Sequence, residues 1–438
     1  MDGETTKARM ETAMIRVFVV IFFFSALACV VFWTVGQPTH EPAFVYDAAA
    51  PQKLPSALNG MSVKSEAGGV SGSGARSRNE DPGDYAGNIM GDVTVEHIPL
   101  TDFDYEKNYP IYTTLLDVVE GWSPDRPEPP KVFKETLAHF DYQNPQEMEL
   151  ALALRQAEVP FKVYNVPEFA EVGEKWTTDY LKKIFKKDGR RSNVEKSKNN
   201  HFMFWAQKRK QTKMSDWKPP TEMVSMSFEQ WLGKAKEADR DKWEAEREHF
   251  YFHYGTSSNS RKETFLAKDL EHFSSEKDNF FVFRPDLNKG IQCRFGMRGI
   301  IAESHYDGGR NMVAMLRGTK RYILAPPKAC KNLGIIADKK HPSYRHSVID
   351  WSDPAQARAN NFASTDAVDT IVREGEVLYI PSYWFHYIIS MEYSIQCNSR
   401  SGSPENNIGG KEIDDCMGTN GEYSIRNRPR RKPRAKWA

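Results

Sequence analysis

The sequence predicts a mainly β fold, a sandwich or barrel, preceded by helical elements and by one N-terminal transmembrane helix. Three observations predict it: short β-type segments separated by Gly, Pro and Asp after about residue 280, helix-type segments before them, and an uncharged apolar run near the N-terminus. The 438 residues carry a formal net charge of +1, and 39% of them are hydrophobic. This ordinary globular composition excludes a wholly disordered chain and a polytopic membrane protein.

The apolar run covers residues 17–35 and contains no charged residue. As a helix it would be roughly 28 Å long, close to the roughly 30 Å hydrocarbon thickness of a bilayer. Three basic residues precede the run, whereas the first basic residue after it is Lys53. By the positive-inside rule, we expect residues 1–16 in the cytosol, 17–36 as the signal-anchor helix of a single-pass type II membrane protein, and the catalytic part in the ER or Golgi lumen or outside the cell.

A cleaved signal peptide is the alternative interpretation of this run, because small residues occur at Ser25–Ala28. The apolar residues continue through Trp33, which is longer than a typical signal-peptide core and favours the uncleaved anchor. A buried core helix would normally show a polar face, which this run lacks.

Composition divides the rest of the chain into three parts. Residues 37–92 are rich in Gly, Ser, Ala and Pro, which predicts a flexible stalk. From Val93 onward, aromatic and β-branched residues become frequent, so we expect the folded domain over 93–412. A basic C-terminal tail is expected over 413–438, since seven Lys or Arg and no acidic residue occur from Ile425 to the end.

Within the domain, the sequence predicts helices followed by strands. Residues 177–185 and 228–249 have helical character, the second with mixed charges at i,i+4 spacing. Six strands are expected at 280–283, 290–295, 311–316, 320–325, 376–380 and 394–398. Short strands at this spacing are typical of a sandwich or barrel.

A possible metal site begins at His305 and Asp307. Residues i and i+2 of a strand face the same side, so an imidazole and a carboxylate can be presented together. A mononuclear non-haem Fe(II) site needs two His and one carboxylate, with the other positions left open. His386, just after the strand expected at 376–380, supplies the third ligand. Taken alone the pattern is weak, because a single His near an apolar strand is more often a core or surface residue.

The residues around the three candidate ligands extend the pattern. In order they are Asn311, Gly318, Lys320–Arg321, Ile323–Leu324, Pro326–Pro327, His341–Pro342, Asp350, Asp353–Pro354 and Glu374–Pro381. In order and spacing they resemble the JmjC/cupin-like Fe(II)/2-oxoglutarate-dependent oxygenases, and within that family the asparaginyl hydroxylases that act on hypoxia-inducible factor. The similarity is strong over about residues 290–400, and a weaker part that includes Val95–Pro99 reaches back to about 93.

The resemblance implies a double-stranded β-helix, a jelly-roll fold of the cupin type. It implies that His305, Asp307 and His386 hold Fe(II), with 2-oxoglutarate and O2 as co-substrates. It also implies that Lys320 binds the distal carboxylate of 2-oxoglutarate, which suits an ammonium inside an apolar barrel. Without the family spacing, a lysine at the end of a hairpin beside Gly318–Thr319 would be the favoured interpretation of Lys320.

Three further residues match family positions near the co-substrate. Asn311 and Asn398 resemble positions whose amides lie beside it, although either could cap a turn. Tyr251 resembles a tyrosine that contacts the same carboxylate, with ordinary aromatic packing as the alternative. One position departs from the pattern: where the related enzymes have a threonine three residues before the first iron-binding histidine, this chain has Ala302. Ser304 cannot simply be assumed to replace that hydroxyl.

These observations predict a membrane-anchored Fe(II)- and 2-oxoglutarate-dependent dioxygenase that hydroxylates a protein side chain. A JmjC-type lysine demethylase is an alternative, and its soluble nuclear form requires residues 17–35 to be something other than an anchor. A non-catalytic, membrane-tethered cupin-like binding protein is another, although a silent barrel would need neither the three ligands nor Lys320.

The expected partners are a protein substrate and, through residues 17–36, the lipid bilayer. Residues 182–218 contain 13 Lys or Arg and 3 Asp or Glu, so the substrate could be acidic. Aromatic residues interleave with these charges and superficially resemble a nucleic-acid surface, but a solvated insertion is the favoured interpretation and nucleic acid is disfavoured. Four cysteines follow the anchor, and their spacing leaves open whether any disulfide forms: Cys293, Cys330, Cys397 and Cys416.

Overall fold

The computed structural model describes residues 89–100, 103–188, 192–205, 217–256, 264–358, 360–404, 407–419, 421 and 423. The predicted cytosolic segment, the predicted anchor at 17–36, most of the predicted stalk and the end of the predicted tail lie outside these residues. Within the described part of the chain, no helix has the length and apolar character needed to cross a membrane.

Two large sheets make up the folded domain. One has nine strands in the order β4-β5-β15-β12-β17-β10-β9-β6-β8, and the other has six in the order β2-β14-β13-β16-β11-β7. A parallel pair, β1 with β3, stands apart from them. The strands are β1 (Thr94–Glu96), β2 (Thr113–Thr114), β3 (Val132–Lys134), β4 (His139–Asp141), β5 (Phe161–Tyr164), β6 (Ser192–Ser197), β7 (His201–Phe202), β8 (Glu222–Met226), β9 (His249–Gly255), β10 (Asn288–Gly296), β11 (Ile301–Tyr306), β12 (Asn311–Arg317), β13 (Thr319–Ala325), β14 (Asp366–Arg373), β15 (Val377–Ile380), β16 (Phe385–Ser390) and β17 (Ser394–Ser401).

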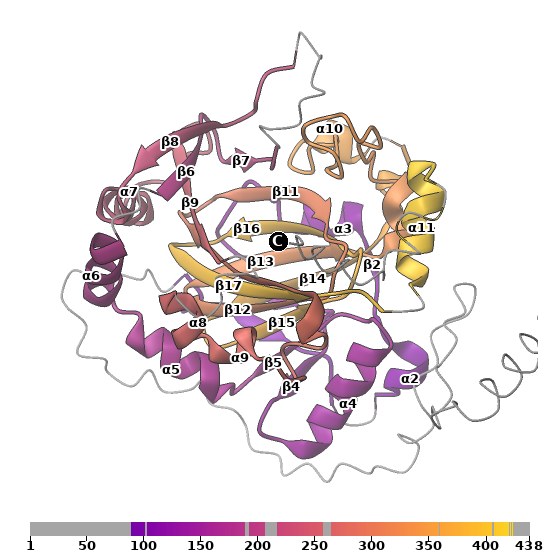
Figure 1. Cartoon of the computed structure of the whole chain (residues 1–438). Helices are drawn as coiled ribbons and strands as arrows, with labels where there is room; N and C mark the ends of the chain where they lie inside the picture. The colour runs from indigo at the N-terminus through magenta and orange to yellow at the C-terminus, as the bar shows by residue number, and fades with distance from the viewer. Residues whose placement is uncertain are drawn as a thin grey trace, which may run out of the picture. The chain divides into compact units, whose positions relative to one another are not determined.

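The last eight strands, β10 to β17, are divided equally between the two sheets. β10, β12, β15 and β17 belong to the larger sheet, and β11, β13, β14 and β16 to the smaller one. Every pairing among them is antiparallel, and Figure 1 shows β11, β16 and β13 side by side. Eight antiparallel strands divided in this way form a jelly roll, which confirms the expected mainly β, double-stranded β-helix fold.

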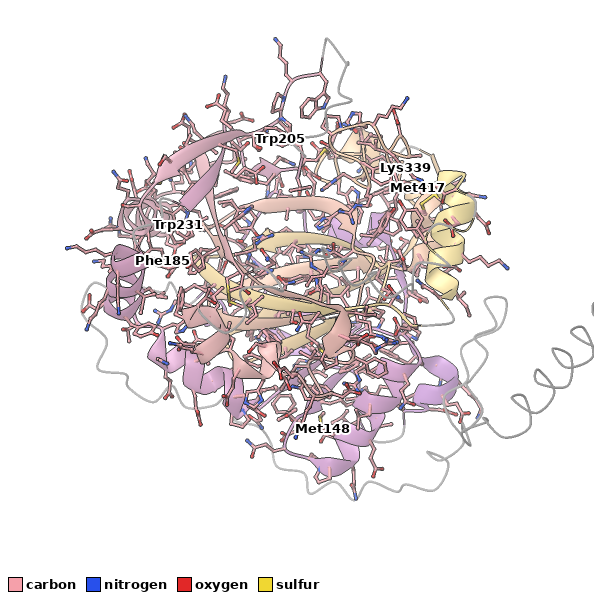
Figure 2. All side chains as sticks on the ribbon, in the orientation of Figure 1. Met148, Phe185, Trp205, Trp231, Lys339 and Met417 are labelled. Atoms are coloured by element: carbon pink, nitrogen blue, oxygen red, sulfur yellow. A yellow bond between two sulfur atoms is a disulfide. The ribbon has the colours of Figure 1, made fainter. Side chains whose placement is uncertain are left out.

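Helices and helical turns surround these sheets. The α-helices are α2 (Tyr105–Asn108), α3 (Leu115–Gly121), α4 (Pro145–Gln156), α5 (Pro167–Lys175), α6 (Thr178–Asp188), α7 (Phe228–Arg240), α8 (Phe265–Asp269), α9 (Glu271–Ser274), α10 (Pro354–Ala357) and α11 (Ile408–Met417), and the 3-10 turns are η2 (Pro285–Leu287), η3 (Pro327–Lys331) and η4 (Asn360–Phe362). Most of the α-helices precede β10, which agrees with the predicted helical N-terminal part. α6 and α7 share an aromatic cluster in which Phe228 stacks on Phe185 at 4.7 Å and on Trp231 at 5.8 Å. Figure 2 labels Phe185 of α6 and Trp231 of α7.

Side-chain alternation separates the outside of the jelly roll from its interior. On β10, Ile291, Cys293 and Phe295 join the hydrophobic cluster that also contains residues of α5, α8 and α9. The alternate positions, among them Gln292 and Arg294, face the opposite side of the sheet because side chains change sides at each residue. The interior therefore receives the polar half of β10.

Two predicted elements differ from the structure. Residues 280–283 are not a strand, because the Asn279 side chain accepts hydrogen bonds from the backbone N–H groups of Phe281 and Val282, which a strand would offer to a neighbour. The helix predicted over 228–249 ends at Arg240. After Arg240 the chain no longer follows the helix axis. Trp243 fixes its direction, because its indole Nε1 donates a hydrogen bond to the backbone oxygen of Asp125, in the segment after α3.

The described fold continues past residue 412, where the sequence places the start of the tail. α11 runs across that position to Met417, and Tyr423 is buried. A disulfide between Cys330 and Cys416 joins η3 to α11. The last part of the tail, from residue 424, lies outside the described residues.

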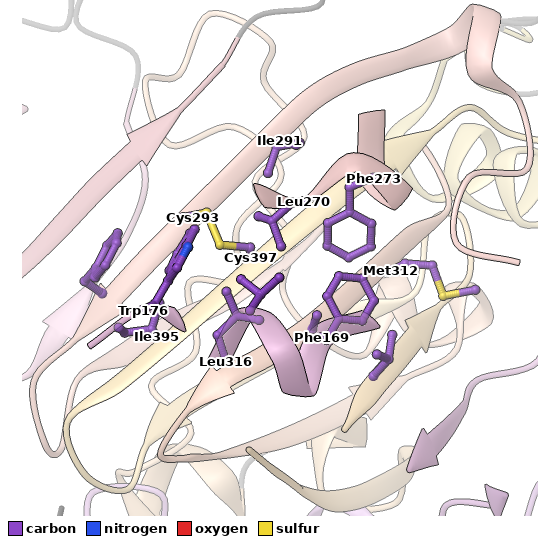
Figure 3. Close-up of a cluster of buried hydrophobic side chains, with 14 of the residues drawn as sticks. Phe169, Trp176, Leu270, Phe273, Ile291, Cys293, Met312, Leu316, Ile395 and Cys397 are labelled. Carbon is purple, nitrogen blue, oxygen red and sulfur yellow. A yellow bond between two sulfur atoms is a disulfide. The ribbon is translucent and has the colours of Figure 1, made fainter. Parts of the chain in front are cut away.

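A second disulfide joins the central strands of the larger sheet. Cys293 on β10 and Cys397 on β17 are register partners, and their sulfur atoms are bonded. Figure 3 shows this disulfide among hydrophobic side chains such as Trp176, Leu270 and Ile395. The question that the cysteine spacing leaves open is therefore answered by strand register and by the position of α11.

Candidate metal centre

His305 and His386 lie opposite each other on neighbouring strands. They are register partners in the antiparallel pair of β11 and β16, and their ring centroids are 4.3 Å apart. Asp307 follows the end of β11, and its Oδ2 lies 4.0 Å from Nε2 of His386. Possible ligand atoms of the three residues all fall within 4.8 Å of one another. The fold thus brings together the three ligands predicted from the sequence.

Backbone carbonyl groups orient both imidazoles. Nδ1 of His305 lies 2.8 Å from the carbonyl oxygen of Glu303, and Nδ1 of His386 lies 3.0 Å from that of Trp384. If each Nδ1 carries the proton and donates, Nε2 of each ring keeps a lone pair for a metal. Burial lowers the pKa of both histidines, and the neutral form required for ligation is thereby favoured.

Asp307 is held by an arginine. Nη1 of Arg400 donates to Oδ1 of Asp307 at 2.6 Å, and Nη1 of Arg345 lies 3.9 Å from the same oxygen. Burial acts to raise the pKa of Asp307, but the positive charges around it, Arg400 foremost, hold that pKa well below its usual range. The carboxylate stays ionised, as a metal ligand must.

Lys320 lies inside the jelly roll next to Tyr251. Its side chain is fully buried, and Nζ lies 3.3 Å from the Tyr251 hydroxyl. No carboxylate of the described residues comes within ion-pair distance of it. Burial, together with the charge of Arg294, lowers the pKa of Lys320 to about 7. A buried ammonium without an anionic partner fits a site for an anionic co-substrate.

Asn311 and Asn398 meet at the same side of the larger sheet. Nδ2 of Asn398 donates to Oδ1 of Asn311 at 2.8 Å, and both side chains are buried. Asn311 is also the register partner of Arg400 across β12 and β17. The two amides therefore share one strand pair with the arginine that holds Asp307, and neither caps a turn.

Ala302 packs against the interior hydrophobic cluster that includes Leu324 and Ile388. A threonine at position 302 would place a hydroxyl in that interior, whereas the alanine side chain offers none. Ser304 is fully buried and its hydroxyl has no hydrogen-bond partner among the described residues. Its backbone oxygen accepts from Ser347 N–H at 2.9 Å, so the loop before α10 is tied to β11 at this point.

Sequence reasoning missed two arginines of the interior, Arg294 and Arg400. The signal was available in the strand alternation: on β17 the residues Ile395 and Cys397 belong to the outer cluster, so Asn398 and Arg400 share the inner face. The same parity places Arg294 inside. A charged residue at an inward position of a strand marks a ligand-binding interior.

A stack of rings leads outward from the triad. His346 stacks on His305 with ring centroids 5.0 Å apart and an interplanar angle of 22°. Phe204 in turn lies parallel to His346, with centroids 6.4 Å apart, and is 58% exposed. Phe204 is thus separated from the candidate metal ligand His305 by one stacked ring, that of His346. An exposed aromatic side chain at such a place is suited to contact a substrate.

An acidic cavity of about 420 Å³ lies beside β11. Four carboxylates line it: Asp125, Glu246, Glu303 and Asp350. Oε1 of Glu303 is 2.5 Å from Nδ1 of His201, whereas Oε2 is buried with no hydrogen-bond partner among the described residues. A cavity of this charge favours a cationic group.

Comparison with known proteins places the chain in a family. A family described as the cupin-like domain matches residues 147–399, more than half of the chain. The chain belongs to the cupin-like domain family. The matched residues include all three members of the His305, Asp307 and His386 triad, together with Lys320.

The relatives of this cupin-like chain include proteins named for a JmjC domain, for lysine demethylation or for tRNA wybutosine synthesis. It is 24% identical over 177 residues to tRNA wybutosine-synthesizing protein 5 of Danio rerio, covering 40% of this chain and 52% of that protein. It is 29% identical over 107 residues to JmjC domain-containing protein D of Dictyostelium discoideum, 24% of each chain. It is 29% identical over 126 residues to lysine-specific demethylase JMJ30 of Arabidopsis thaliana, 27% of each chain. The matches thus span between about a quarter and a half of these relatives, which fit the 2-oxoglutarate oxygenase superfamily.

Proposed function

We propose that this protein is a membrane-anchored Fe(II)- and 2-oxoglutarate-dependent dioxygenase that hydroxylates a protein side chain. The observation that carries the proposal is the triad of His305, Asp307 and His386, in which backbone carbonyls direct both Nε2 atoms and Arg400 holds the carboxylate. Two imidazoles and one carboxylate on one side, with the remaining positions open, suit mononuclear Fe(II).

His305, Asp307 and His386 would hold the iron. With iron, 2-oxoglutarate and O2 bound, such a centre puts one oxygen atom into a substrate C–H bond and the other into succinate, as 2-oxoglutarate loses CO2. The chain's own part is to orient the ligands, keep them deprotonated and surround the reaction with a closed interior.

The positive charge of the interior supports 2-oxoglutarate as co-substrate. Arg294, Lys320 and Arg400 line this region with Asp307 and Glu195 as the nearby carboxylates. A dianion offsets this excess, and one of its carboxylates can pair with the ammonium of Lys320. The Tyr251 hydroxyl, 3.3 Å from Nζ, is available to the same carboxylate.

The substrate is proposed to be a protein, and two features predict opposite charges for it. The basic stretch at 182–218, of which residues 189–191 and 206–216 lie outside the described part, favours an acidic segment. The cavity beside Glu303 favours a basic group. A panel of acidic, basic and neutral peptides separates these preferences by their KM values.

The location is proposed to be the lumen of the ER or Golgi, or the cell exterior, with residues 17–36 as the anchor. Besides the uncharged run and the basic residues before it, two disulfides support this, because disulfides persist in oxidising compartments. Carbonate extraction tests the anchor, since an anchored protein stays in the membrane pellet. Protease protection of intact vesicles tests the side on which the domain lies.

The experiment that tests the activity measures succinate from full-length protein with Fe(II), 2-oxoglutarate and a panel of proteins and peptides. Mass spectrometry then looks for a gain of one oxygen atom in a substrate. Because the sequence motifs resemble those of the asparaginyl hydroxylases, asparagine-containing peptides belong in the panel, and a tRNA arm follows from the name of the Danio rerio relative. Absence of succinate with every substrate, together with unchanged iron content in His305→Ala, would refute the proposal.

Two alternatives remain distinguishable by the same assay. A lysine demethylase would remove a methyl group from methyl-lysine peptides and release formaldehyde, and one relative carries that name. A non-catalytic binding protein would form no succinate with or without substrate. The intact triad and the buried, anion-free Lys320 favour either enzyme over the non-catalytic binding protein, and formaldehyde release separates the two enzymes.

A further inference from the structure

Three residues at the N-terminal side of the domain form a second cluster of possible metal ligands. His97 follows β1 and Glu135 follows β3, and these two strands pair in parallel with Glu96 opposite Lys134. His139 begins β4. Possible ligand atoms of the three residues lie within 4.8 Å of one another. The chain therefore brings two imidazoles and a carboxylate together from three separate segments.

The contacts within the cluster are short. Nδ1 of His97 lies 2.7 Å from Oε2 of Glu135. The rings of His97 and His139 have centroids 4.7 Å apart. His97 is partly exposed, with about a third of its side chain accessible, whereas Glu135 is buried. A ligand could thus reach the cluster from the side of His97.

Two polar atoms of the cluster have close polar neighbours but no well-aligned hydrogen bond. Oε1 of Glu135 lies 2.9 Å from Nζ of Lys162 and also accepts from Thr370 Oγ1 and from the N–H of Ile371. Oε2 of Glu135 and Nε2 of His139 are both buried and make no aligned hydrogen bond among the described residues. Their nearest polar contacts are Nδ1 of His97, 2.7 Å from Oε2, and Oε1 of Glu376, 3.3 Å from Nε2. A metal ion bound by both histidines and Glu135 would satisfy the two atoms.

The charges around the cluster favour a cation. Glu135 and Glu376 contribute two negative charges, and Lys162, whose Nζ also lies 3.2 Å from Glu376 Oε2, contributes one positive charge. With neutral imidazoles, the groups in direct contact carry one net negative charge, and Arg373 acts on Glu376 from farther away. Lys162 contacts Oε1 of Glu135, so it orients the carboxylate and leaves Oε2 toward the histidines.

We propose that His97, Glu135 and His139 bind a zinc ion. Two imidazole nitrogens and one carboxylate oxygen are ligands that Zn²⁺ accepts in tetrahedral geometry, with a water in the fourth position, whereas Mg²⁺ and Ca²⁺ require mostly oxygen ligands. The site shares no residue with the His305 triad and does not rest on the proposed oxygenase function. It ties the segment after β1 to β4 at the edge of the larger sheet.

The test uses full-length protein carrying His305→Ala and Asp307→Ala, so that the first triad no longer contributes. The chelator-treated protein is titrated with Zn²⁺, and with Co²⁺ as a visible-absorption probe of the ligand geometry. We expect one metal ion per chain, cobalt bands of a four-coordinate site, and a higher melting temperature with Zn²⁺ than with chelator.

In this background, His97→Ala and His139→Ala should each weaken Zn²⁺ binding by more than about tenfold, since loss of even an outer-shell partner costs that much. His97 is partly exposed, so its replacement should leave the fold intact by circular dichroism. His272→Ala is the matched control: its Nε2 lies 3.8 Å from Glu271 Oε1 on the surface without a third ligand, and binding should be unchanged.

Two results would overturn the zinc site. One is a protein that binds no Zn²⁺ or Co²⁺ at micromolar concentration once the first triad is removed. The other is binding that His97→Ala, His139→Ala and the shape-conserving Glu135→Gln leave unaltered while these variants remain folded. In either case the cluster is an ion-pair network between Lys162, Glu135 and Glu376.

Discussion

Arg400 donates a hydrogen bond of 2.6 Å to Asp307, from Nη1 to Oδ1. The two residues lie 93 positions apart in the chain, and the arginine contacts the candidate metal centre through the carboxylate without belonging to the triad. One oxygen of Asp307 is thus occupied by a cation, which leaves Oδ2 on the side of His386. The arrangement makes Arg400 a positioning residue for the metal ligand.

Replacing Arg400 should therefore weaken metal binding. Arg400→Leu removes the hydrogen bond and the charge that keeps Asp307 ionised, so Fe(II) affinity should fall about 10- to 100-fold. Equilibrium titration with Fe(II) under anaerobic conditions measures it. Arg247→Leu, which breaks a surface pair with Asp241 at 3.2 Å, is the control and should not change the affinity. Equal affinity in Arg400→Leu would exclude the positioning role.

Lys320 predicts a pH dependence for the proposed co-substrate. Its pKa in the empty protein is about 7 because burial and Arg294 disfavour the charged form. A carboxylate binds the charged form, so the KM for 2-oxoglutarate should rise as pH increases from about 7 to 9. Lys320→Met should raise KM at all pH values and remove this slope. If the KM for 2-oxoglutarate still rises with pH in Lys320→Met, a group other than Lys320 is responsible for the titration.

Lys320 also lowers the stability of the folded protein, although its charge favours binding of the co-substrate. The pKa of Lys320 is lower in the folded protein than its usual value of 10.5, so the unfolded chain binds more protons between about pH 7 and 10.5. The destabilisation is fully present below pH 7 and disappears as pH rises toward 10.5. Lys320→Met should therefore be more stable than the wild type near pH 7, by urea unfolding, with the difference shrinking at higher pH.

Phe204 should contribute to substrate binding without affecting the metal centre. Phe204→Ala removes an exposed ring that lies parallel to His346, which we expect to raise the substrate KM about three- to tenfold, equivalent to ~1 kcal/mol. Succinate formed in the absence of substrate should stay the same. Val132→Ala, another exposed hydrophobic residue, serves as the comparison and should leave KM unchanged. A fall in the substrate-free rate would place Phe204 in the metal centre itself.

The disulfide between Cys330 and Cys416 should stabilise the C-terminal helix. It closes a loop of 86 residues, and removing such a cross-link typically costs about 2–4 kcal/mol. The double variant Cys330→Ser/Cys416→Ser should lose that amount of unfolding free energy, measured with denaturant. Reducing agent should no longer destabilise α11 in this variant, because the cross-link is already absent. If reduction of the wild type changes nothing, this disulfide does not contribute to stability.

Glu392 predicts that stability falls as pH rises. Burial raises its pKa to about 8, and the pKa of neighbouring Asp239 is raised to about 7. The folded protein then binds more protons than the unfolded chain between about pH 4.5 and 8, so this contribution is present at low pH and is lost through pH 8. Glu392→Gln should gain about 1–3 kcal/mol at pH 8 and little at pH 5. Thermal unfolding at the two pH values measures both.

Strand positions and candidate metal ligands could be predicted because they depend on local patterns. Alternation, turn residues and the spacing of His305, Asp307 and His386 are properties of short segments, and five of the six predicted strands occur in the structure at nearly the predicted positions. The strand predicted at 280–283 is absent because one side chain, Asn279, takes up its backbone donors. The alternation of apolar and polar residues does not reveal when a side chain takes the backbone hydrogen bonds that a strand would need.

What the sequence determined by itself is a mainly β domain and the candidates for its chemistry: three possible metal ligands and Lys320 as a possible partner of an anionic co-substrate. The tertiary structure decided which distant residues support them. Arg400 contacts Asp307 because β17 lies next to β12, and Cys293 faces Cys397 because of the register of β10 with β17. Register and sheet order arise from the summed burial of many side chains, so no short segment contains them.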